Sequence, residues 1–139
     1  MKKLTVLILV SVFFLASCEK NATPSAPVVD TVSNDAMDKY IGVFMNGPYG
    51  RVSGKASVVE TNGKYQLKLD SFMTTNGPDL KVYISKEVQP LNFIRLGDLK
   101  STSGTQVYDI PGMPDFAAYK YALIHCEQYN HLFGSAQLK

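Results

Sequence analysis

Residues 51–72 read RVSGKASVVETNGKYQLKLDSF, and this stretch decides the fold class. Apolar and polar side chains alternate in both of its halves, with Leu67 and Leu69 on one side of the second half, which is the pattern of a strand with one buried face. Between the halves stands Asn62-Gly63, whose tolerance of positive φ angles suits the tight turn of a hairpin. The stretch therefore predicts two antiparallel strands joined by a two-residue turn.

Similar short runs continue toward the carboxyl end, with Gly-Pro, Ser-Gly and Pro-Gly breaks between them. They read DLKVYIS, NFIRL, TQVYDI, YKYALIHCE and HLFGSAQL. In the first run, Leu80, Val82 and Ile84 are expected to face inward because they occupy every second position. Helical spacing extends over no more than one turn, near SNDAMDKY or PDFAAY. We therefore predict an all-β fold, an antiparallel sandwich or barrel-like structure of about seven to eight short strands.

The amino terminus has the features of an export signal. Lys2 and Lys3 precede an apolar run from Leu4 to Leu15, which is too short to span a bilayer and has the length of a signal-peptide core. The LASC that follows resembles the lipobox of bacterial lipoproteins, which implies cleavage after residues 1–17 and a diacylglycerol on the thiol of Cys18. An ordinary secretory signal with an incidental cysteine is the alternative.

Lipidation would make the membrane the first partner of the mature chain, because several acyl chains at Cys18 suffice for stable attachment. Glu19 rather than Asp follows the cysteine, which favours the outer membrane. Residues 18–38, with two prolines and no periodicity, are expected to form the anchor and a flexible tether, and residues 39–139 the domain.

Charge argues against nucleic acid as a partner. Loss of the two signal-peptide lysines lowers the 14 basic residues to 12, which equals the 12 acidic residues of the chain. The mature protein is therefore close to neutral, and it contains no basic cluster that would attract a phosphate backbone.

Several strand motifs occur in an order typical of one small domain: IGVF, VSGKAS, LDSFMTTNGPDLKVYIS, LGDLKSTSGTQVYDIP and YALIHCEQYNHLFGSAQL. Together they resemble the DM-thirteen electron-transfer domain, a β module found in bacterial lipoproteins and beside cytochrome-type DOMON domains. The positions that carry the resemblance are Phe72, Gly77, Pro78, Asp79, Leu80, Val82, Tyr83, Gly104, Gln106, Tyr108, Cys126, Phe133, Gly134, Ala136 and Leu138.

The resemblance implies electron transfer or thiol redox chemistry at the cell envelope, with Cys126 as its centre and a redox or protein partner. In the family the cysteine is thought to act as a bare thiol or to hold a prosthetic group, so a haem or a metal is implied by resemblance only. This chain departs from the family pattern at His125, where a Trp is usual, and at His131, where an apolar residue is usual.

The residues themselves leave the role of Cys126 open. Strand alternation groups it with Ala122 and Ile124, which favours an inert cysteine in the core. A redox thiol would instead need partial exposure and a positive neighbour, and His125 or His131 would supply that charge only when protonated.

No metal site is predicted from these residues. His125 is adjacent to Cys126 on the same strand and points to the opposite face. His131 is an odd number of positions away and also faces away, unless residues 127–130 form a turn or bulge. The chain has no CxxC, HxxxH or CxxCH motif, and a haem would have to take a ligand such as Met73 or Met113.

Two further features suggest a competing function, a non-catalytic module that binds a partner protein or a glycan. Asp79 follows Gly77-Pro78 and is expected either to accept backbone N–H bonds or to face a ligand from the loop. Tyrosines on strands usually pack their rings while the hydroxyl stays hydrated. The alternatives are a stacking platform for a sugar or a path for an electron. These tyrosines are Tyr83, Tyr108, Tyr119, Tyr121 and Tyr129. Hydrolase motifs, including GxSxG, are absent from the sequence.

Overall fold

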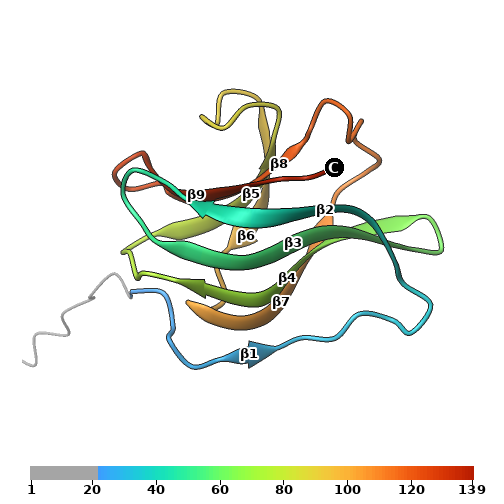
Figure 1. The fold of residues 1–139 in the computed structure, drawn as a ribbon, viewed down its shortest axis with the longest axis horizontal. Coiled ribbons are helices and arrows are strands. Elements are labelled where there is room, and N and C mark those ends of the chain that lie inside the picture. Colours follow the sequence, from blue (N-terminus) through green and yellow to red (C-terminus); the bar gives the residue numbers. More distant parts are fainter. Residues whose placement is uncertain (1–21) are drawn as a thin grey trace, which may run out of the picture.

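A computed structural model describes residues 22–139 as one curled β-sheet (Figure 1), so the all-β prediction is confirmed. The sheet has nine strands rather than seven or eight, because two strands precede the hairpin from which the prediction started. The described part of the chain contains no helix, and so none that is long and apolar enough to cross a membrane. The strands are β1 (Val28–Val29), β2 (Met37–Asn46), β3 (Val52–Thr61), β4 (Lys64–Thr74), β5 (Leu80–Ser85), β6 (Phe93–Asp98), β7 (Ser103–Ile110), β8 (Tyr121–Cys126) and β9 (His131–Gln137).

The strand order across the sheet is β1-β7-β4-β3-β2-β9-β8-β5-β6. Neighbouring strands are antiparallel except β1 and β7, which are parallel. Because the sheet curls, β5, β6 and β8 lie behind β3, β4 and β7 in Figure 1, and the inner faces of the two halves enclose a single main core. The fold is therefore barrel-like.

The hairpin predicted from residues 51–72 is confirmed. Thr61 pairs with Lys64 across the turn, and Asn62 and Gly63 both have positive φ angles, of 51° and 76°. Such angles define the turn type whose twist matches that of the two strands. Leu67 and Leu69 are fully buried in the core. The hairpin thus forms the central part of the sheet, with β2 and β7 on either side.

Residues 22–30 form a strap along the edge of the sheet, so the prediction of a flexible tether over residues 18–38 is wrong for this part. β1 pairs with β7, the main-chain N–H of Thr102 donates to the carbonyl of Pro24 at 2.8 Å, and the Ser101 hydroxyl donates to that of Ala26 at 2.6 Å. The strap satisfies the outer edge of β7, which would otherwise be open for pairing with another chain. The signal peptide and Cys18 lie outside the described residues.

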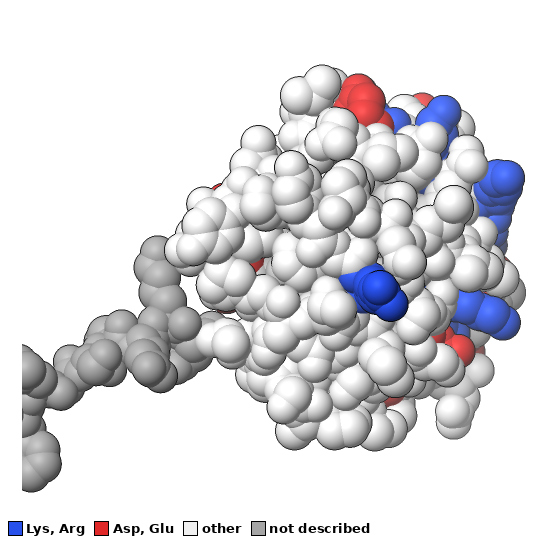
Figure 2. Space-filling model, turned by 60° about the vertical axis from the view of Figure 1, so that its left-hand side comes forward, with Lys and Arg blue, Asp and Glu red and all other residues white. Residues whose placement is uncertain are grey.

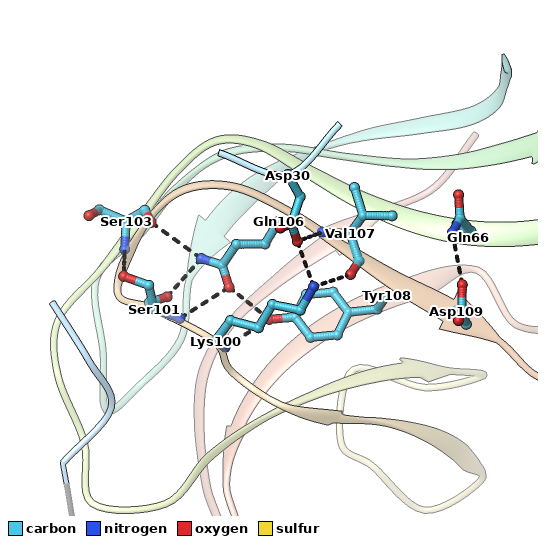
Figure 3. Close-up of polar contacts among 9 residues, drawn as sticks. All are labelled: Asp30, Gln66, Lys100, Ser101, Ser103, Gln106, Val107, Tyr108 and Asp109. Carbon is cyan, nitrogen blue, oxygen red and sulfur yellow. Dashed lines mark hydrogen bonds and ion pairs between the residues drawn. The ribbon is translucent and has the colours of Figure 1, made fainter. Parts of the chain in front are cut away.

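Figure 3 shows the polar contacts that fasten the strap. The Asp30 carboxylate accepts hydrogen bonds from Lys100 Nζ at 2.5 Å and from the Val107 N–H at 3.0 Å. The bond from Lys100, followed by the bond from Val107, holds the pKa of Asp30 below its usual value. Because the carboxylate is ionised and paired in the folded state, it fixes the end of the strap on β7.

The loop beneath the strap is held by a buried network around Gln106 (Figure 3). Gln106 Nε2 donates to the carbonyl of Ser101 at 2.8 Å, and its Oε1 accepts from the Tyr108 hydroxyl at 2.7 Å. That hydroxyl in turn accepts from the Lys100 N–H at 3.0 Å. Gln106 and Tyr108, two of the positions that carry the family resemblance, therefore serve to hold this loop in place.

Gly104 permits the strap to approach β7. Its φ angle is +105°, and a Cβ atom at this position would lie 2.0 Å from the carbonyl oxygen of Val28. Any side chain would therefore both strain the backbone and displace β1.

Candidate functional site

Cys126 is the last residue of β8 and lies on the inner face of the sheet. Only 1% of its surface is exposed, and it belongs to the main core together with Ala122 and Ile124. The predicted grouping of these three residues on one face is confirmed. The thiol is free and buried, so a bulky partner has no direct access to it in this conformation.

His131 lies opposite Cys126. Residues 127–130 form the four-residue turn between β8 and β9, and the strand register pairs Cys126 with His131. Directly opposed residues point to the same face with Cβ atoms about 5 Å apart. Counting along the strand alone predicted that His131 faces away, and the turn reverses that result.

An aromatic stack covers this end of the barrel. The ring of Tyr49, from the loop between β2 and β3, lies parallel to the His131 ring with centroids 3.6 Å apart. Tyr49 is 57% exposed, and the equally exposed Tyr129 lies 5.8 Å from His131 on another side. His131 therefore lies in register with the buried cysteine, and its ring stacks on Tyr49 and lies near Tyr129.

Glycines allow the chain to close tightly around Phe133, which is buried beside Cys126 in the core. A Cβ atom at Gly50 would lie 2.5 Å from the Phe133 ring, and one at Gly77 would lie 2.9 Å from it. A Cβ atom at Gly134 would likewise lie 2.5 Å from the Val52 side chain. The Gly-Pro-Asp and Phe-Gly motifs of the sequence thus pack against each other.

His125 points to the outer face, away from Cys126. It is 3% exposed, and its ring lies 5.6 Å from that of Tyr83. Its Nε2 lies 3.0 Å from Asn130 Oδ1, which as a carbonyl oxygen only accepts, so this nitrogen carries the proton and Nδ1 is left buried without a partner. Burial lowers the pKa of His125, so the ring is neutral near neutral pH and supplies no positive charge to the thiol.

The Glu127 carboxylate also faces the outer side. It accepts a hydrogen bond from the Tyr83 hydroxyl at 2.6 Å and another from Arg95 Nε at 2.9 Å. Burial and the bond to Glu127 raise the pKa of Tyr83, so its hydroxyl stays protonated. Glu127 is therefore engaged on the face opposite Cys126, although it is next to it in sequence.

Asp79 fastens its loop, but through different atoms from those expected. Its carboxylate lies 2.7 Å from Lys81 Nζ, and it is its main-chain oxygen that accepts a bond from the Glu127 N–H, at 3.0 Å. Lys81 lies 2.8 Å from Asp98 as well, although only 9% of the Lys81 side chain is exposed. Sequence reasoning missed this buried lysine because strand alternation alone makes it an outward, solvated residue.

The surroundings of Cys126 do not fit a haem or a metal ion. No three His, Cys, Asp or Glu side chains between residues 22 and 139 come together as a metal site requires. Five depressions on the described surface are each lined by other residues, and none includes Cys126, His125 or His131. A prosthetic group at the thiol would have to displace the packed core.

Comparison with protein families matches residues 44–138 to the family described as Electron transfer DM13. The matched segment runs from the last three residues of β2 to just beyond β9 and contains Cys126, Asp79 and both histidines. Comparisons with curated proteins and with solved structures returned no match. The family match confirms the resemblance drawn from the strand motifs.

Proposed function

Because this chain belongs to the DM13 electron-transfer family, we propose that it is the electron-transfer domain of a lipid-anchored cell-envelope protein. The anchor is Cys18, the location is the outer membrane, and the redox centre is the bare thiol of Cys126. The observation that carries the proposal is the register pair of Cys126 and His131 beneath the exposed Tyr49.

The site favours one-electron chemistry over thiol–disulfide exchange. Disulfide exchange requires a thiolate that a partner can reach, whereas Cys126 is buried in an apolar core. The nearest permanent cations of β5 and β6, Lys81 and Arg95, face the other side and are paired with carboxylates. The thiol is therefore closed to large reactants.

In the proposed step, the S–H bond of Cys126 breaks, its proton passes to a ring nitrogen of His131, and one electron leaves through the Tyr49–His131 stack. The products are a thiyl radical on Cys126 and an imidazolium, and the electron reduces a one-electron acceptor, such as an oxidised metal centre of an envelope partner. Reduction reverses each transfer. The stacked rings, 3.6 Å apart, shorten the distance that the electron has to cover to the surface.

Stoichiometric oxidation tests the redox centre. The folded protein is mixed with hexachloroiridate(IV), a one-electron oxidant, and the oxidant consumed is followed against time. We expect a fast phase in the wild type that is absent from both Cys126→Ala and Cys126→Ser, and slower in His131→Phe because the proton acceptor is lost. Two cysteine variants are used because the serine hydroxyl is expected to destabilise the core.

The tyrosines provide the control, because they are oxidised too and give the background in the cysteine variants. Identical oxidant consumption by the wild type and both cysteine variants would rule out Cys126 as the redox centre. Titration of the thiol before and after denaturation adds a second check, since a core cysteine reacts with a bulky reagent only after unfolding.

A binding module is the second candidate, favoured by the surface beside Tyr49. A depression of about 480 Å³ there is lined by uncharged residues of the β2–β3 loop, Thr75 and Asn76, with Arg51 at its edge. Such a module would bind an envelope partner equally well in the wild type and in Cys126→Ala. Loss of partner binding in the alanine variant, with the fold retained, would count against it.

A further inference from the structure

The two ends of the barrel differ in how many of their charged loop residues form ion pairs. The proximal end comprises loops 47–51, 75–79 and 99–102, turn 127–130, and the start of the strap. At the opposite, distal end, the loops carry Lys86, Glu87, Asp115 and Lys120. Figure 2, turned to bring the left side of Figure 1 forward, shows a broad surface with almost no charged side chains and one basic side chain near its middle.

Arg51 is the unpaired charge of the proximal end. It is exposed and forms no ion pair with any residue from 22 to 139. The other charged residues of these loops are all engaged: Asp79 with Lys81, Lys100 with Asp30, and Glu127 with Arg95. The proximal end therefore presents one free guanidinium and no free carboxylate.

Exposed apolar and aromatic side chains lie on the loops and strand ends at the same end of the barrel, and two of them, Tyr49 and Met73, each line a depression together with Arg51. Tyr49 and Tyr129 are each 57% exposed, Met45 is 72% exposed and Met73 is 62% exposed. Tyrosines with one apolar and one polar end, and an arginine with a long apolar stem, are the side chains that suit the interface between lipid and water.

The strap leads the chain to this same end. Asn76 Nδ2 donates to the carbonyl of Thr23 at 2.9 Å, so the first described residues lie against loop 75–79. Four peptide steps separate Ala22 from Cys18, and a chain spans at most about 14 Å over that length. A free tether over residues 18–38 would have reached about 70 Å. The strap thus shortens the connection between Cys18 and the domain to a length comparable with the radius of gyration of a domain of this size, about 13 Å for a hundred residues.

We propose that the proximal end rests on the lipid headgroup surface of the membrane that holds the Cys18 acyl chains. Tyr49, Tyr129, Met45 and Met73 meet the interface, and Arg51 binds lipid phosphates. The inference rests on the proposed lipidation of Cys18 and adds an orientation to it. The distal end, where Lys86, Glu87, Asp115 and Lys120 form no ion pair with any residue from 22 to 139, then faces away from the membrane.

Depth-dependent quenching tests the orientation on the full, lipidated chain in vesicles of phosphatidylethanolamine and phosphatidylglycerol. A fluorophore is attached at Pro48→Cys on the proximal end or at Gln89→Cys on the distal end, both exposed loop positions. Cys126 is buried and Cys18 is acylated, so only the introduced thiol is labelled. Lipids with a shallow nitroxide are expected to quench the label at position 48 several-fold more than that at position 89. Equal quenching, or the reverse order, overturns the proposal.

Two variants test whether the short connection between Cys18 and the domain sets the orientation. A flexible Gly-Ser linker of about ten residues, inserted between Asn21 and Ala22, lengthens this connection without changing the domain. Gly104→Ala displaces the strap, with Gly112→Ala as its control, because Gly112 also has a positive φ but a Cβ there meets nothing within 4 Å. The difference in quenching between the labels at positions 48 and 89 should shrink with the linker and with Gly104→Ala. It should persist in Gly112→Ala. An undiminished difference with the linker overturns the role of the strap.

Mass spectrometry of the purified chain tests the lipidation of Cys18 separately from the orientation of the domain on the membrane. Acylated Cys18 together with equal quenching overturns only the orientation. A chain without acyl groups on Cys18 overturns the lipid anchor and, with it, the docking of the proximal end.

Discussion

The two faces of β8 place neighbouring residues in opposite surroundings. Cys126 lies on the inner face in an apolar core, whereas His125 lies on the outer face beside Tyr83. Both are almost fully buried, with 1% and 3% of their surface exposed. The inner face is stabilised by apolar packing. The outer face combines a small apolar cluster of Tyr83, Leu123 and Leu132 with hydrogen bonds and ion pairs among polar groups. Burial of a residue in this sheet therefore does not show which of the two kinds of stabilisation it takes part in.

The largest expected effect contrasts one phenylalanine from each face. Phe133→Ala on the inner face should lower the free energy of unfolding by about 3–5 kcal/mol, because it leaves a cavity in the closed core. Phe93→Ala should cost about 1 kcal/mol, since Phe93 is 41% exposed and mainly stacks on Tyr83. Urea denaturation measures both. Similar losses would show that the outer face is packed as densely as the inner one.

The second contrast concerns Cys126 itself. Cys126→Ser should lower the free energy of unfolding by about 1–3 kcal/mol, because its hydroxyl would be buried among apolar side chains without a partner. Cys126→Ala should cost less, since it introduces no polar group. The same urea titrations give the two values. A serine variant as stable as the alanine variant would mean that the inner face offers a hydrogen-bond partner near the thiol.

On the outer face, Lys81→Met should lower the free energy of unfolding by about 1 kcal/mol, because the carboxylates it leaves are partly solvated. The bond from Lys81 is the main cause that lowers the pKa of Asp98 below 3.8. The variant should therefore raise that pKa toward 3.8, and NMR titration of the Asp98 carboxyl measures it. In the wild type, the Asp98 carboxylate contributes its full stabilisation above its unfolded pKa of about 3.8 and loses it as the pH falls through the lower folded pKa. The variant should therefore lose less stability in acid than the wild type does.

Lys64→Met, on the exposed hairpin, is the matched control for this prediction. Lys64 has no ion pair in the described residues, so its removal should leave the Asp98 titration unchanged. A shift of equal size in both variants would point to general charge effects rather than to the Lys81 contact.

The smallest expected effect is a pH dependence from His125. Burial lowers its folded pKa below 6.5, so the unfolded chain binds the proton more readily. Stability should therefore be fully present above about pH 6.5 and fall as the pH drops toward the folded pKa, by at most about 1.4 kcal/mol per pH unit. His125→Gln should flatten this slope in urea titrations at about pH 7.5 and about pH 5.5. An unchanged slope would show that another group dominates it.

Much of the fold followed from local patterns. The alternation around Asn62-Gly63 predicted the central hairpin, and the run from Leu80 predicted the inward face of β5, because one buried face imposes a period of two. The grouping of Cys126 with Ala122 and Ile124 followed for the same reason. The strap was missed, since residues 22–30 owe their order to main-chain bonds with β7 that composition does not show.

The candidate site was only partly predictable. The motifs pointed to Cys126, and His131 was expected to face away from it unless residues 127–130 form a turn. The structure has that turn, which pairs His131 with Cys126 across β8 and β9. Tyr49 did not stand out in the sequence, since it lies in a glycine-rich loop some eighty positions away from the histidine on which it stacks. A contact at that separation exists only after the sheet has curled.

The sequence by itself determined the class of fold and which side chains share a face within each strand, because both depend on neighbours a few residues apart. Only the tertiary structure decided which faces and ends come together. It placed His131 opposite Cys126 and stacked Tyr49 on the His131 ring, paired the buried Lys81 with two carboxylates, and bound part of the expected tether to the edge of the sheet. The physical reason is that hydrogen bonds and packing across the curled sheet depend on distance in space, which strand register and sheet closure set and local pattern does not.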